Sequence, residues 1–419
     1  MLNDYFIRPT TVDRIRECWI GEPIERYVTW LNEKNYARRS VFARVPLLVQ
    51  FGEFAKRAGA TSVDDLPHHI EPFVEDKLNR LKPKSSKSER QVAARGLRNP
   101  IQQMLRLVIP NLGGNAEGRN NPFREAAPGF FEFLRRERGL SEATLVQYRH
   151  CLQLLQDYLR KLGRPLLPTL SPAVITAFIT KSGDIRNERS VQSICSILKS
   201  FFRYLYAEGL MVCNMAKTIE SPRRYRFSNL PRSITWHEVE QMLLKVDRRS
   251  TVGKRDYAIL LLLVTYGLRS REVAALSLDD IDWKRDCIHV RGRKAGHSTA
   301  YPLMPTVGEA VLDYLRQGRP VTSERAVFMA VHAPYIPISR VAVSAQARCH
   351  IRRAGINVHR PGSHTLRHTC VQRLVDSGFS LKTIGDFLGH RSPDATKIYA
   401  KVNVEALRRV ALGNGEEIL

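Results

Sequence analysis

Hydrophobic residues recur at helical spacing through the first half of the chain, and this pattern predicts helices there. Tyr148, Leu152, Leu155 and Leu159, for example, stand three or four residues apart, which places them along one face of a helix. The same periodicity runs through the first hundred residues. We therefore expect the first half of the chain to consist of small all-helical modules.

Two stretches without this periodicity divide the chain. Residues 110–122 are dense in Gly, Asn and Pro, whereas residues 220–232 are basic and carry a proline near each end. Such compositions are typical of turns and linkers. The sequence therefore predicts three domains of ordinary size, which span residues 1–115, 116–225 and 226–419.

The first two predicted domains align with each other as a diverged repeat. Their apolar positions match in order, and the match continues past one inserted residue to a glycine in each copy. It indicates that residues 1–115 form a second helical module of the same kind, although two four-helix units can also align through periodicity alone. The aligned pairs are Tyr27 with Phe130, Trp30 with Phe133, Leu31 with Leu134, Phe51 with Leu155, Phe54 with Tyr158, Gly59 with Gly163, Leu66 with Leu170 and Ile70 with Val174.

The third predicted domain mixes helical and strand signals. Residues 256–266 suit a buried helix, and residues 270–276 suit a polar one. Three short β-like runs follow, at residues 280–283, 287–291 and 299–303, and they predict an antiparallel meander. The expected fold class is mainly α, with helical N-terminal modules and an α+β domain that carries a small three-stranded antiparallel sheet.

The charge of the chain points to a polyanionic partner. Lys and Arg number 66 and Asp and Glu 41, which leaves a net charge of +25. A basic excess spread through folded sequence favours nucleic acid, because neutralised phosphates release their counterions. Ribosome-associated and membrane-surface proteins can share this balance, but they usually carry it in tails or in one amphipathic stretch.

Other bulk features limit the class of protein. The longest apolar run, residues 258–264, is far shorter than the ~18 residues of a membrane-spanning helix. The first residues lack the layout of a signal peptide, so we expect the protein to act in the cytoplasm, at the nucleoid. Seven unpaired cysteines suit a reducing compartment, and we expect all of them to be small core residues.

An arginine after the buried helix is the first candidate for chemistry. Arg269 follows residues 256–266, and Glu272 stands where it could brace the guanidinium. A guanidinium held by a carboxylate is oriented for bidentate contact with a phosphate. In isolation, the same pair could be a surface ion pair.

Three further candidates lie toward the C-terminus. His364 and Arg367 stand three residues apart on a predicted helix, a spacing that a solvated basic face also produces. His390 follows the predicted helix 381–388 and its stop at Gly389, and Tyr399 lies two turns into the next helix. A helix-turn-helix motif has the same outline, and Tyr399 could be a core residue.

The order of these motifs resembles the tyrosine recombinase (phage integrase) family. The sequence has Arg269, a hairpin lysine, His364-x-x-Arg367, Leu-Gly-His390 and, nine residues later, Tyr399. The resemblance covers residues 235–400, and residues 122–215 resemble that family's helical core-binding (SAM-like) domain. The family implies a site-specific DNA recombinase, which could serve integration, excision, transposition or resolution of multimers. The extra N-terminal module favours a mobile element. Such a recombinase acts without a metal or nucleotide cofactor.

The resemblance also assigns a role to each candidate. Arg269 and Arg367 neutralise the scissile phosphate, His390 hydrogen-bonds it, and Glu272 supports Arg269. Tyr399 attacks phosphorus to give a 3′-phosphotyrosyl bond, and His364 assists proton transfer at Tyr399. The general acid is a lysine at the hairpin tip, where Lys294 fits better than Arg293, because a guanidinium is a poor proton donor near neutral pH.

The expected partner is double-stranded DNA, bound by a homotetramer on two DNA sites, with sister recombinases or accessory proteins as further partners and no membrane. Residues 1–115 are an extra module relative to many phage integrases. Apolar residues 404, 407, 410 and 412 suit a helix that docks on a neighbouring protomer or packs at home. The alternatives are a type IB topoisomerase-like enzyme and a catalytically silent DNA-binding protein.

Overall fold

The computed structural model describes residues 2–80, 87–109, 121–163, 167, 170–222, 233–291 and 298–389, with Lys87 and Ser88 described only through their backbone. Contacts divide the chain into two compact units, residues 110–228 and residues 1–109 with 229–419. This division does not test the three-domain boundaries, which stay a prediction. No helix among the described residues has the length and apolar content needed to cross a membrane.

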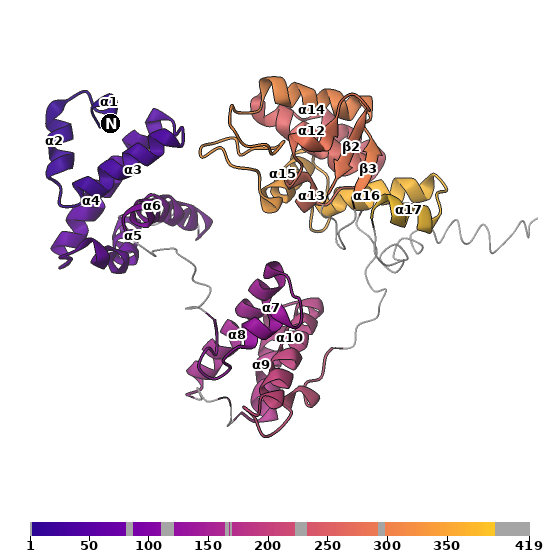
Figure 1. The fold of residues 1–419 in the computed structure, drawn as a ribbon, viewed down its shortest axis with the longest axis horizontal. Coiled ribbons are helices and arrows are strands. Elements are labelled where there is room, and N and C mark those ends of the chain that lie inside the picture. Colours follow the sequence, from indigo (N-terminus) through magenta and orange to yellow (C-terminus); the bar gives the residue numbers. More distant parts are fainter. Residues whose placement is uncertain are drawn as a thin grey trace, which may run out of the picture. The chain divides into compact units, whose positions relative to one another are not determined.

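Residues 2–109 form a helical bundle, as the apolar periodicity predicts (Figure 1). Its longest helices pack through buried apolar residues such as Val45, Leu48 and Met104. Helix α6 contacts α3, α4 and α5, so it closes the bundle. The elements are α1 (Leu2–Tyr5), α2 (Pro9–Glu17), α3 (Gly21–Glu33), α4 (Arg38–Arg57), the 3-10 helix η1 (Val63–His69), α5 (Ile70–Asn79) and α6 (Lys87–Val108).

Residues 121–222 form a second helical bundle with its own core. Helix α10 carries much of that core, including Phe201, Phe202 and Leu205, and contacts both α8 and α9. Asn187 caps α10 by accepting a hydrogen bond from the backbone N–H of Ser190 at 3.0 Å. The elements are α7 (Phe130–Arg136), α8 (Glu142–Lys161), α9 (Pro172–Ile185), α10 (Glu188–Ala207) and η3 (Met215–Lys217).

Helices α4 and α8 correspond turn by turn, which supports the internal repeat. Both are 20 residues long, and both lead to a glycine with positive φ, Gly59 at 92° and Gly163 at 65°. The positions buried at matching places in both helices, each at most 1% exposed, are Val41 and Leu145, Leu48 and Leu152, Phe51 and Leu155, and Ala55 and Leu159. The two bundles therefore share a core register as well as a periodicity.

Residues 233–389 form the α+β part of the chain (Figure 1). The sheet is antiparallel with strand order β1-β2-β3, as the sequence predicts. Ile288 pairs with Tyr301 across β2 and β3, and both side chains are buried. The elements are α11 (Trp236–Leu244), α12 (Thr251–Thr265), α13 (Ser270–Ala274), η4 (Leu278–Asp280), β1 (Ile281–Asp282), β2 (Cys287–Val290), β3 (Thr299–Pro302), α14 (Pro305–Gln317), α15 (Arg340–Arg353), α16 (Ser363–Asp376) and α17 (Leu381–Phe387).

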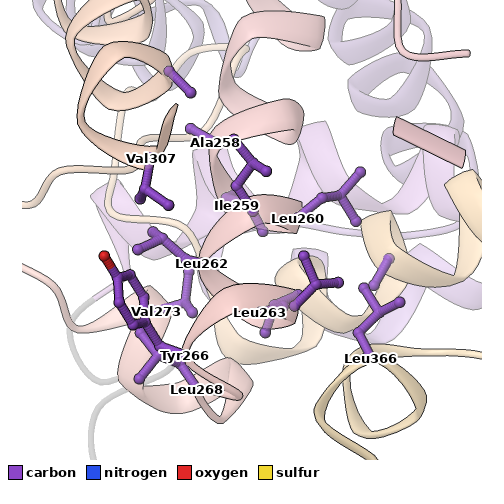
Figure 2. Packing of buried hydrophobic residues seen from close by; sticks show 14 of the residues in the cluster. Ala258, Ile259, Leu260, Leu262, Leu263, Tyr266, Leu268, Val273, Val307 and Leu366 are labelled. Carbon is purple, nitrogen blue, oxygen red and sulfur yellow. The ribbon is translucent and has the colours of Figure 1, made fainter. Parts of the chain in front are cut away.

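Helix α12 is the centre of this core. Every residue from Ala258 to Val264 is buried, so the helix is surrounded on all sides rather than along one stripe. It contacts α11, α13, α14, α15 and α16. Figure 2 shows Leu366 of α16 close to Leu263 of α12, and both belong to one apolar cluster. Packing against α12 thus fixes α16, the helix that carries His364 and Arg367.

A charged network that the sequence did not predict lies buried in the first half of α12. The guanidinium of Arg255 donates to Asp256 at 2.7 Å and to the carbonyl of Met329 at 3.2 Å. The second carboxylate oxygen of Asp256 lies 3.1 Å from Nε2 of His350. Each charge is compensated within the core, as buried ionic groups require. The network ties α12 to α15 and to the segment that follows α14.

The expectation for the cysteines was wrong in part. Cys151, Cys195 and Cys370 are buried core residues, as predicted. Cys213 is exposed, because it lies in the irregular segment after α10, and the other three are only half-buried. All seven are free thiols.

Candidate active site

Arg269 is presented by a tight turn after α12. Gly267 adopts a left-handed conformation with φ +59°, and a Cβ atom there would lie 2.9 Å from Cδ2 of Leu388 and 3.2 Å from Sγ of Cys370. Both the backbone angle and the close neighbours therefore require glycine. Arg269 then precedes α13 in extended conformation. The turn brings the end of α12 against α16 and the residues after α17.

Glu272 holds Arg269, as the sequence predicts. The guanidinium donates to Oε1 of Glu272 at 2.8 Å, and the backbone N–H of Arg269 donates to Oε2 at 2.9 Å. The Glu272 side chain is 1% exposed and that of Arg269 is 25% exposed. The buried carboxylate thus fixes an arginine that still reaches the surface, which suits a guanidinium that must meet a ligand.

Arg367 is buried, in contrast to the partly exposed Arg269. It lies in α16 and is 5% exposed. Its guanidinium donates to the carbonyl of Gly267, two residues before Arg269, and to the carbonyl of Leu388 at 3.3 Å. One side chain therefore connects α16, the turn that carries Arg269 and the segment that leads to His390.

His364 lies in the first turn of the same helix. Helix α16 begins at Ser363, so His364 and Arg367 share one helix, as their spacing predicts. Their environments differ, because His364 is exposed whereas Arg367 is buried. The helix therefore carries an exposed imidazole about one turn before a buried cation.

Three aromatic residues join the sheet to this region, and the sequence analysis did not identify them as part of the site. The ring of Tyr301 in β3 lies 5.2 Å from that of Tyr266 and 5.0 Å from that of Phe387, between ring centroids. The hydroxyl of Tyr301 donates to the carbonyl of Phe387. Their only sequence signal was apolar character at strand and helix positions, which any core residue shares.

Tyr266 and Cys370, which lie beside the site, are poor nucleophiles. Burial raises the pKa of Tyr266, and its hydroxyl donates to the carbonyl of Pro302 at 2.8 Å. Burial also raises the pKa of the Cys370 thiol to about 12. Both groups therefore stay protonated near neutral pH. The rings of Tyr266 and Tyr301 pack together, and Cys370 lies beside Gly267.

Several predicted site residues lie outside the described residues. They are Arg293 and Lys294 in the hairpin, and His390 and Tyr399 after α17. The same applies to the predicted C-terminal helix around residues 404–412. Gly389 is the last described residue, and its φ of +61° matches the predicted left-handed end of α17. Among the described residues, no group of three or more His, Cys, Asp or Glu side chains could hold a metal ion.

The charges of the described site residues indicate which ligand the site can bind. Arg269 is oriented by a carboxylate, and Arg367 is oriented by main-chain carbonyls. Two fixed guanidinium groups near an exposed histidine suit an anionic ligand with several oxygen atoms, such as a phosphodiester.

We predict that Gly267→Ala reduces DNA cleavage at least tenfold while DNA binding is retained. The left-handed backbone costs a residue with a Cβ about 1–2 kcal/mol, and here the added methyl also pushes against Leu388. Gly355→Ala is the matched control, since its φ is +81° and its Cβ would meet nothing within 4 Å. Cleavage and binding assays on both variants check this, and equal cleavage by the two would contradict it.

The chain is similar to known proteins over most of its length. A model described as the phage integrase family matches residues 232–406, and one described as the phage integrase N-terminal SAM-like domain matches residues 128–209. A protein of Sinorhizobium fredii named y4rA, described as an integrase/recombinase, is 30% identical over 390 residues, which cover 92% of this chain and 92% of that protein.

Two further proteins are similar over a large part of the chain. The tyrosine recombinase XerD of Lacticaseibacillus casei is 29% identical over 282 residues, which cover 66% of this chain and 94% of that protein. The structure of a lambda integrase tetramer bound to a Holliday junction aligns with a TM-score of 0.53 and 20% identity, covering 72% of this chain and 84% of that one. At this identity the structural match indicates a shared fold.

Proposed function

The chain belongs to the phage integrase family of tyrosine recombinases and is a site-specific DNA recombinase, and we propose that Arg269, Arg367 and Tyr399 carry its chemistry. The observation that supports this most is the contact of Arg367 with the carbonyls of Gly267 and Leu388. It brings the arginine turn and the segment before His390 to one helix. Family relatives described as integrases and recombinases favour this function over a topoisomerase or a silent DNA-binding protein.

In the proposed reaction, Tyr399 attacks the scissile phosphorus of double-stranded DNA. A bond forms between phosphorus and the phenolic oxygen, and the bond to the 5′-oxygen breaks, which leaves a 3′-phosphotyrosyl linkage. Arg269 and Arg367 neutralise the charge that grows on the non-bridging oxygens, and Glu272 keeps Arg269 in position. Attack by a 5′-hydroxyl reverses these steps and rejoins the strand.

Proton transfers complete the reaction. The departing 5′-oxygen takes a proton from Lys294, and the phenol of Tyr399 loses its proton with the help of His364. His390 hydrogen-bonds the phosphate. These roles need no metal or nucleotide, because the phosphotyrosyl bond conserves the energy for rejoining.

The proposed assembly is a homotetramer on two DNA sites, joined by sister recombinases or accessory proteins. Support comes from the fold shared with lambda integrase, which has been solved as a tetramer bound to a Holliday junction. Integration, excision or transposition of a mobile element is the biological role we propose. The protein then acts in the cytoplasm, at the nucleoid, where such DNA lies.

We predict that Arg269→Ala lowers cleavage by about 10²–10³-fold, as expected when one fixed donor to the developing charge is removed. Binding should be largely retained, because one phosphate contact among many lowers the salt slope by about one. Arg271→Ala is the control, since Arg271 is an exposed cation two residues away. DNA cleavage measured beside DNA binding checks this. Cleavage by Arg269→Ala at the wild-type rate would refute the role of Arg269.

We also predict which hairpin residue is the general acid. Lys294→Ala should slow cleavage of ordinary DNA by about 10²–10⁴-fold. Replacing the 5′-bridging oxygen with sulfur should restore its rate, because a thiolate leaves without a proton. Arg293→Ala is the matched control and should show no selective recovery on the sulfur substrate. Single-turnover rates on both substrates test this, and recovery confined to Arg293→Ala would transfer the role to Arg293.

A further inference from the structure

Helix α6 of residues 1–109 extends beyond the core that anchors it. Its second half is packed, with Ile101, Met104 and Leu105 fully buried. By contrast, no residue from Glu89 to Gly96 is buried. About two turns of helix therefore stand exposed at the start of α6, where they contribute little to the core.

The exposed face of α6 carries cationic and amide side chains. Gln91, Arg95, Asn99, Gln102 and Arg106 follow one another at spacings of three or four, so they line one side of the helix. Four of them are exposed, and Gln102 is half-buried. The only acidic residue within α6 is Glu89, at its start. The helix thus presents a continuous stripe of arginine, glutamine and asparagine.

Three arginines of α6, of which Arg95 and Arg106 belong to this stripe, are not used to hold the bundle together. Arg98 is paired with Glu71 at 2.6 Å, as an arginine with a structural role would be. Arg90, Arg95 and Arg106, in contrast, form no ion pair or hydrogen bond with any residue that the structure describes. Three guanidinium groups on one helix are therefore available to a partner.

Two neighbouring positions also indicate that something contacts this helix. A Cβ atom on Gly96 would meet nothing within 4 Å, so no packing within the described chain requires glycine. Glycine inside an exposed helix costs about 1 kcal/mol relative to alanine, yet it lets another backbone approach closely. One turn earlier, Val92 is 66% exposed. Both features suit a face that is covered in a complex.

We propose that this face of α6 binds duplex DNA, which makes residues 1–109 a second DNA-binding module of the chain. The proposal rests on the proposed function, which supplies DNA as the partner. Arginine suits phosphates and guanine edges, glutamine and asparagine suit adenine edges, and the major groove admits a helix. A second copy of the chain is a poor partner for this face, because it too carries +25.

The internal repeat supports the same conclusion independently. Helix α4 matches α8 in length and buried positions, and α8 lies within the residues matched by the SAM-like integrase domain. Helix α6 follows α4 and α5 as α10 follows α8 and α9. Residues 21–80 and 87–108 thus share the helix order and core positions of a module that belongs to the phage integrase family.

The test compares two triple variants of the full chain with the wild type. The stripe variant, Arg90→Gln/Arg95→Gln/Arg106→Gln, removes both arginines of the stripe and the neighbouring Arg90. The control, Arg8→Gln/Arg14→Gln/Lys34→Gln, removes equal charge from exposed positions in α2, before it and after α3. Binding to a labelled ~40-base-pair duplex is measured over a series of salt concentrations. The stripe variant should lower the salt slope by about two to three, and the control should leave it nearly unchanged.

A neutral variant separates contact from charge. Gly96→Leu should weaken binding without lowering the unfolding temperature, because the added side chain enters open space in the free protein. A wild-type slope for the stripe variant, or an equal loss in both triple variants, would overturn the proposal. So would a changed oligomeric state, measured by light scattering, with unchanged DNA binding, since α6 would then bind a second copy.

The same experiments distinguish a failure of the proposed cleavage chemistry from a failure of the proposed DNA binding by α6. Covalent capture of DNA by the stripe variant at saturating protein should equal that of the wild type, because α6 is not part of the proposed chemistry. If the wild type captured no DNA while the slopes still differed, the proposed chemistry would fail and the role of α6 would stand. If capture occurred and the slopes were equal, α6 would have no role in DNA binding.

Discussion

The buried guanidinium of Arg367 is the interaction on which the described part of the site depends. A buried cation is costly unless its donors are satisfied, and Arg367 meets this requirement through the carbonyls of Gly267 and Leu388. Those two carbonyls belong to segments more than a hundred residues apart in sequence. Satisfying one charge therefore fixes the arginine turn after α12 against the end of α17. Gly267 completes the arrangement, because a side chain there would occupy the space of Leu388.

The two arginines are held in different ways, and the difference suits their proposed task. Arg269 is paired with a buried carboxylate, which gives it direction while its side chain stays partly exposed. The two carbonyls that bind Arg367 carry only partial charge, so these contacts orient its guanidinium without neutralising it. Tyr301 contacts Tyr266 and Phe387, so it joins β3 to the segments that hold the two arginines. In the sequence, Lys294 lies between β2 and β3.

Much of this architecture could be predicted from the sequence. The features that could not be predicted depend on contacts that only the folded chain creates. Periodicity predicted the helical modules and the three short strands. Gly389 predicted the left-handed end of α17, and the position of Glu272 after Arg269 predicted their pairing. Arg255, Asp256 and His350 were missed, because a buried ionic network needs partners that only the fold brings together. Tyr301 was seen as a strand residue, and its bond to Phe387 depends on tertiary contact. Cys213 was expected in the core, but hydrophobic character alone does not determine burial.

The central claim is that this chain forms a covalent bond to DNA through Tyr399. The most direct measurement incubates wild type and Tyr399→Phe with labelled DNA from the flanks of the encoding gene, without added metal, and separates the denatured products on a gel. The account predicts a slow-migrating protein–DNA adduct with the wild type and none with the variant. Adduct formation by Tyr399→Phe, or tight salt-sensitive binding by the wild type without any adduct, would contradict it.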